Sequence, residues 1–88
     1  MNEKYEMALV KALVGQIIFL EFTDESKLNL DDAVTAQEQI SLSLAALDRK
    51  NKIKLSNTIQ QCATDFPDEF ADFIQTIPQA LNLRNESI

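Results

Sequence analysis

The sequence has no histidine and no tryptophan, and it holds one cysteine, one glycine and two prolines in 88 residues. A sheet of many strands needs more tight turns than one glycine and two prolines supply, so these absences disfavour β architecture. The frequent Ala, Leu, Gln, Glu and Lys residues favour helix instead. We therefore predict an all-α fold in which residues 1–88 form a single domain.

The same absences restrict the chemistry. Without histidine, Cys62 cannot form a Cys–His nucleophile pair, and zinc has no plausible ligand set. The acidic stretch that begins at Asp24 fails as a calcium loop: Leu28 stands at an oxygen-ligand position, Asn29 at the required glycine and Thr35 at the bidentate glutamate. We predict that the chain is not an enzyme and has no metal or other cofactor.

A long apolar run is also missing. The uncharged segment Ala12–Leu20 is less than half as long as the roughly 20 residues that a membrane span requires. No signal-peptide cleavage pattern follows it, and a lone cysteine points to no oxidising compartment, so we predict a cytoplasmic protein that does not bind membrane.

Acidic residues dominate the charge. Fourteen acids against eight bases give a net charge of −6, which opposes binding to nucleic acid and favours a basic protein partner. A net charge of this size is also ordinary for a small domain, so the acids could serve solubility alone.

The N-terminal quarter of the chain is the most apolar. Residues 3–22 predict a long central helix that is apolar nearly all round. A strand over Ile17–Phe22 is the alternative, because that segment is rich in β-branched and aromatic residues.

A second helix is predicted from Asn29, a good N-cap, to about Asp48, with Asp31 and Asp32 in its first turn. Its main apolar stripe consists of Ala33, Ala36, Ile40, Leu44 and Leu47. A weaker stripe on roughly the opposite side consists of Val34, Leu42, Ala45 and Ala46, and it is either covered by a neighbour or left for a partner.

The rest of the chain predicts two shorter helices. Cations are favourable at a helix C-terminus, so the basic residues of 49–54 are expected at the end of the second helix, with the joint to the third inside Asp48–Lys52. The third helix is predicted to run to about Thr64. The fourth is predicted over 67–76, with Pro78 ending or kinking it. Its apolar stripe consists of Phe66, Phe70, Phe73 and Ile77. The predicted architecture is a compact four-helix bundle with a short C-terminal helical extension.

Two acidic clusters are candidate binding surfaces. The first contains Glu21, Asp24, Glu25, Asp31 and Asp32; the second contains Asp65, Asp68, Glu69 and Asp72. Each could be an ordinary solvated surface. If both lie on one side of the bundle, they create a field suited to docking a cationic protein.

The segments FLEFTDESKLNLDDAVTAQEQISLSLAALD and DFPDEFADFIQTIPQALNL resemble small acidic helical immunity proteins of contact-dependent growth inhibition and Rhs-type polymorphic toxin systems. The matching positions are Phe19–Glu21, Asp32–Val34, Glu38–Gln39 and Ile77–Pro78. The chain departs from the pattern at Leu30, where similar sequences tend to have proline.

The resemblance implies a cytoplasmic antidote that binds one cognate toxin domain and blocks its active site. Many such toxins are nucleases with basic grooves, in which carboxylates can stand in for phosphates. Phe22, Leu28 and Leu30 would add apolar anchors beside the two acidic clusters.

Two other functions fit the residues. The chain could be a helical adaptor or regulator that binds through the weaker stripe of the second helix, with a homodimer as one form of this alternative. It could also be a small DNA-binding regulator that uses Arg49–Lys54, although four bases in a chain of net charge −6 make a poor electrostatic footprint.

Overall fold

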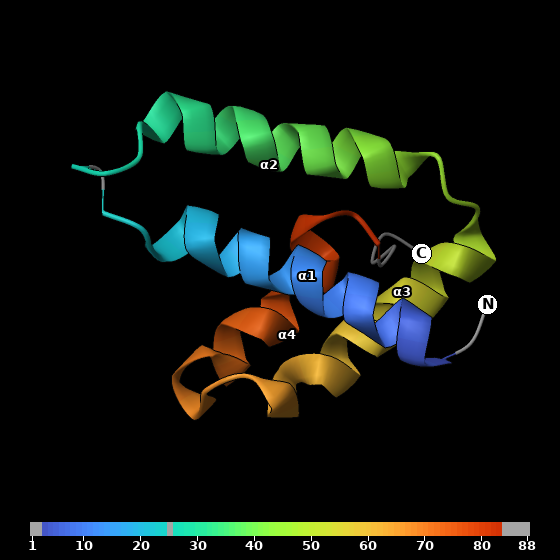
Figure 1. Cartoon of the computed structure of the whole chain (residues 1–88). Helices are drawn as coiled ribbons and strands as arrows, with labels where there is room; N and C mark the ends of the chain where they lie inside the picture. The colour runs from blue at the N-terminus through green and yellow to red at the C-terminus, as the bar shows by residue number, and fades with distance from the viewer. Residues whose placement is uncertain (1–2, 25, 84–88) are drawn as a thin grey trace.

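The computed structural model describes residues 3–24 and 26–83 (Figure 1). These residues form no strand. They form four α-helices, α1 (Glu3–Phe22), α2 (Leu30–Ala45), α3 (Arg49–Gln61) and α4 (Ala71–Ala80), with the 3₁₀ helices η1 (Cys62–Asp65) and η2 (Asp68–Phe70) between α3 and α4. The predicted all-α fold is confirmed, and the strand alternative for Ile17–Phe22 is wrong.

The core is built by α1, α3, η1 and α4, which pack against one another. Its members are the buried side chains Val10, Val14, Ile17, Ile59, Cys62, Ala63, Ile74, Ile77, Leu81 and Leu83. The central position predicted for α1 is confirmed, since α1 contacts α2, α3 and η1. One face of α1 nevertheless stays uncovered, because Tyr5, Leu9 and Phe19 are about half exposed.

Helix α2 forms an outer layer that runs back along α1 (Figure 1). It begins as predicted: the Asn29 Oδ1 accepts hydrogen bonds from the backbone N–H groups of Asp31 (2.8 Å) and Asp32 (3.2 Å). Ala33 is its one fully buried residue. The radius of gyration is 13.2 Å, somewhat above the about 12 Å typical of this length, as expected when one helix lies on the outside.

The joint between α2 and α3 corrects two predictions. Helix α2 ends at Ala45 rather than Asp48, because Asp48 has an extended backbone and caps α3, its Oδ1 accepting a hydrogen bond from the Asn51 N–H (2.8 Å). The bases of 49–54 therefore open α3 instead of closing α2. The Asp48 cap contributes about 1 kcal/mol and places a carboxylate at this end of α3, which offsets part of the unfavourable interaction of the cations with the helix dipole.

The third and fourth helices also differ from prediction. Helix α3 ends at Gln61 and continues as η1. Helix α4 passes through Pro78 and ends at Ala80. Of the two outcomes predicted for Pro78, ending the helix is wrong: its ring is fully buried, and burial offsets the hydrogen bond that proline cannot donate.

The predicted short C-terminal extension is the last turn of α4, and a capping turn closes it. The Leu83 N–H donates to the Pro78 carbonyl (2.9 Å) and the Asn82 N–H donates to the Gln79 carbonyl (3.0 Å), the two bonds of a Schellman motif. The motif requires a left-handed residue, and Asn82 has a φ of 60°. It turns Leu83 back into the core.

This cap can be tested at Asn82. Replacing Asn82 by Ala is expected to lower the free energy of unfolding by about 1 kcal/mol, because alanine tolerates a left-handed backbone less well than asparagine. Urea denaturation measures the change. The matched control is Asn57→Ala on α3, where alanine should be neutral or stabilising because Asn57 is exposed within a helix. Equal gains in stability at both positions would contradict the capping role.

Candidate protein-binding site

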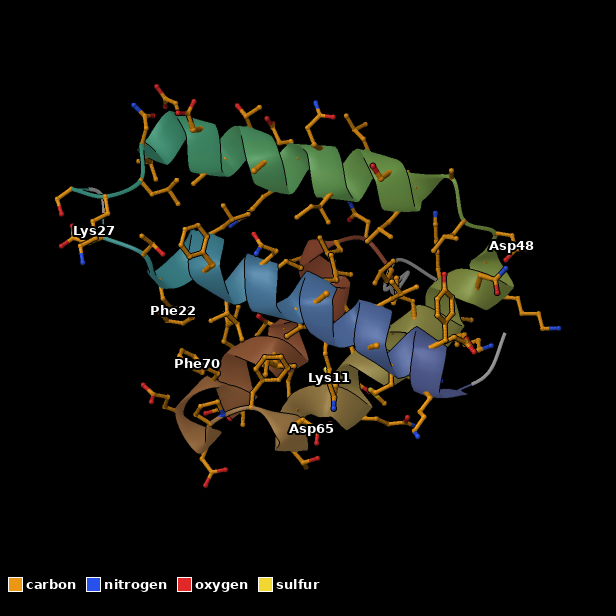
Figure 2. All side chains as sticks on the ribbon, viewed as in Figure 1. Lys11, Phe22, Lys27, Asp48, Asp65 and Phe70 are labelled. Atoms are coloured by element: carbon orange, nitrogen blue, oxygen red, sulfur yellow. The ribbon has the colours of Figure 1, made fainter. Side chains whose placement is uncertain are left out.

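An aromatic cluster brings the predicted surfaces together. The Phe22 ring at the end of α1 lies 5.2 Å from the Phe70 ring and 5.1 Å from the Phe73 ring, between ring centroids. Figure 2 shows Phe22 and Phe70 side by side at the end of the molecule where the chain leaves α1. The cluster therefore joins the first acidic segment to η2 and the start of α4.

Acidic side chains lie on the elements that carry or adjoin this cluster. We define the acidic end as the exposed residues Glu21, Asp24, Asp31, Asp32, Asp68, Glu69 and Asp72. Figure 1 places the α1–α2 connection and η2 at the same end of the molecule. No acid of this set forms an ion pair with a base in 3–24 or 26–83, since the two ion pairs there involve Glu6 and Asp65. Lys27 in the α1–α2 connection is exposed at the same end (Figure 2), so the acidic end presents an excess of negative charge that one base offsets in part.

Three of these acids also shape the backbone. The Asp24 Oδ1 accepts a hydrogen bond from the Ser26 N–H (3.0 Å), and the Asp24 carbonyl accepts from the N–H groups of Lys27 and Leu28. Asp31 and Asp32 lie in the first turn of α2, where carboxylates are favourable. Their placement has a structural reason, which is compatible with a binding role because the side chains stay exposed.

Apolar residues lie beside the acids as predicted anchors require. Phe22 is 55% exposed and Leu30 is 58% exposed, whereas Leu28 is half-buried. The predicted contact residue Glu25 lies outside the described residues. Exposed apolar side chains next to unpaired charges are typical of interfaces with a desolvated centre.

Asp65 stands apart from the other predicted contacts. Its Oδ2 lies 3.3 Å from the Lys11 Nζ, and Figure 2 shows this pair near the middle of α1, away from Phe22. Both side chains are nearly half exposed, so the pair adds at most about 1 kcal/mol to stability. Lys11 nonetheless compensates the Asp65 charge, which removes Asp65 from the acidic end.

A groove that the sequence did not predict lies between α2 and α4, with α1 as its floor. Its volume is about 590 Å³, and its apolar lining residues include Ile17, Val34, Leu42, Phe73 and Ile77. The predicted weaker stripe of α2 gave a partial signal. The signal was incomplete because the opposite wall comes from α4, more than 30 residues further along the chain.

The described residues show no arrangement suited to metal chemistry. Among residues 3–24 and 26–83, no three or more Asp, Glu or Cys side chains lie close enough together to hold a metal ion. Within that part of the chain, no helix has both the length and the apolar character needed to cross a bilayer.

The single thiol is a core group. Cys62 is fully buried, and its Sγ donates to the Ile59 carbonyl (3.1 Å). Burial raises the pKa of this thiol, and the nearby Asp65 carboxylate raises it further. Because the thiolate is the nucleophile, the native thiol should be inert.

We expect Cys62 to react with Ellman's reagent at least 100-fold more slowly in native buffer than in 8 M urea. Because the pKa of Cys62 is raised in the native state, its protonated thiol stabilises the fold at pH values below the ordinary pKa of 9.0. This stabilisation is lost as the pH rises through the native pKa. Free glutathione in both buffers controls for reagent effects. Rapid labelling of the native protein would contradict the buried position.

Comparisons with protein-family models, with curated proteins and with solved structures gave no match to this chain.

Proposed function

We propose that this chain is an immunity protein that binds and neutralises a cognate bacterial toxin domain through its acidic end. The observation that supports this proposal is the acidic end itself, where seven exposed acids without described ion-pair partners share one end of the molecule with the exposed Phe22 and Leu30. The resemblance of the sequence to immunity proteins adds the expectation that the partner is a toxin.

The proposed mechanism is occupation of a basic substrate groove. Carboxylates of the acidic end take the places of substrate phosphates, and charge-assisted hydrogen bonds to lysine or arginine hold them there. Phe22 and Leu30 bury apolar area next to these contacts and exclude water. A nuclease blocked in this way loses access to its substrate without any chemical step by the inhibitor.

The decisive experiment uses the toxin domain encoded beside the gene. Co-expression of this chain should rescue growth from that toxin, and the two purified proteins should form a complex on a sizing column. A non-cognate toxin domain of similar charge serves as the control for non-specific attraction. No complex and no rescue would contradict the proposal, and rescue from both toxins would contradict its specificity.

A further inference from the structure

We propose that the groove between α2 and α4 binds an amphipathic helix of another protein, with an apolar face toward the groove and basic residues along its edge. This inference does not depend on the toxin partner, because the groove is a different surface from the acidic end. Of the seven residues of the acidic end, only Glu21 also lines the groove.

The packing of α2 creates the groove. Helix α2 rests mainly on α1 and stands off from α4. Val34 and Leu42 of α2 are 50% and 67% exposed, and Phe73 and Ile77 of α4 form the opposite wall above Ile17 of α1. Its two walls run along α2 and α4, and an elongated groove of this kind suits a chain segment better than a compact small molecule.

The length of the groove fits two helical turns. Its residues on α2 extend from Val34 to Leu42, and those on α4 extend from Phe73 to Leu81. At 1.5 Å per residue, each wall is about 12 Å long. Two turns of a bound helix place side chains at i, i+3 or i+4 and i+7 into such a groove, which is the recurrent geometry of helix-in-groove recognition.

Charge complementarity specifies a basic helix. Glu21 and Glu38 line the groove, and no lysine or arginine is among its lining residues. Both carboxylates are exposed, and neither forms an ion pair with a described base. A helix with lysines or arginines at the edge of its apolar face would pair with them, whereas an acidic helix would be repelled.

The probe is a helical peptide of about 14 residues with three leucines at i, i+4 and i+7 and lysines elsewhere on the surface. A second peptide carries glutamates in place of the lysines, and a third has the lysine sequence scrambled so that no apolar face forms. Fluorescence anisotropy measures binding, and amide chemical shifts show where each peptide binds. Saturable binding of the first peptide alone, with shifts on α2 and α4, is the expected result.

Protein variants locate the site. Leu42→Asn and Val34→Asn are expected to weaken binding of the lysine peptide by about tenfold or more. Their matched control is Leu9→Asn on the outer face of α1, which is 52% exposed and should leave binding unchanged. Glu38→Gln should weaken binding and reduce its salt dependence, whereas Glu69→Gln on η2 should do neither.

Several results would overturn the inference. One is that the lysine peptide shows no saturable binding up to about 1 mM. A second is that the glutamate peptide binds equally well, and a third is that Leu9→Asn loses binding whereas the groove variants keep it. Binding of a small aromatic amine in the groove without any binding of the peptide would show a small-molecule site and would equally overturn it. The groove variants are also assayed for toxin neutralisation, so that failure of the groove proposal can be told apart from failure of the proposed function.

Discussion

Ile74→Ala is expected to lower the free energy of unfolding by about 3–4 kcal/mol, an effect typical of truncating a fully buried isoleucine. Ile74 is 0% exposed and lies in the core between α1, α3 and α4. Removing its outer carbons loses their transfer free energy and leaves a cavity that three packed helices cannot close. In a domain of this size the loss approaches the whole stability, so much of the variant should be unfolded at 37 °C.

Urea denaturation followed by circular dichroism measures this loss, with the midpoint shifting and the slope unchanged if unfolding stays two-state. The matched control is Leu42→Ala, which also shortens an apolar side chain on a helix but at a position that is 67% exposed. That change should stay within about 0.5 kcal/mol. Equal losses from the two variants would mean that α4 is not packed as described.

Ile74 also shows where reasoning from the sequence fell short. The apolar stripe of the fourth helix was drawn through Phe66, Phe70, Phe73 and Ile77, and of these Ile77 alone is fully buried. The three phenylalanines are half-buried, and Phe70 and Phe73 contact the single Phe22 ring, at the residue where α1 ends. Which side of α4 is most deeply buried depends on where α1 ends in space, and periodicity along α4 carries no information on that.

The features that the sequence predicted correctly have local causes. The start of α2 follows from Asn29 and the two aspartates after it, because an N-cap hydrogen bond joins residues two or three apart. The bounds of α1 follow from a long apolar run that ends in an acidic turn. At Asp48 two local signals point to different helix ends. The neighbouring bases favour the end of α2, whereas the Asp48 side chain favours the start of α3 as an N-cap, and the cap is the signal that prevails.

The candidate site was predictable in its residue types but not in its geometry. Exposed acids and apolar neighbours on the α1–α2 turn can be read from the chain, whereas their proximity to η2 depends on the contact of Phe22 with Phe70 and Phe73. The separation of Asp65 from this set depends on Lys11, a partner from another helix. Both are long-range contacts, which a pattern in one segment cannot specify.

Neutralising four acids of the acidic end is expected to slow association with the toxin domain by about 10- to 100-fold at low salt. The variant combines Asp31→Asn, Asp32→Asn, Asp68→Asn and Glu69→Gln. All four side chains are exposed and lack described ion-pair partners, so the loss of stability should come mainly from the α2 dipole, at about 0.3–1 kcal/mol for each aspartate. Stopped-flow fluorescence measures the association rate.

The salt dependence distinguishes steering from other causes. The rate for the natural chain should fall steeply as ionic strength rises, and the variant should show a flatter dependence, so that the two rates converge near 1 M salt, where the Debye length is about 3 Å.

The control adds two positive charges on α3, Asn57→Lys with Gln61→Lys, and is compared with the Asp31→Asn and Asp32→Asn pair, which changes the net charge by the same amount. Steering by the acidic end requires the second pair to have the much larger effect, because focused charge at the contact surface raises encounter rates whereas remote charge of the same size is screened. Equal effects of the two pairs would mean that net charge alone attracts the partner and that its docking surface lies elsewhere on the chain.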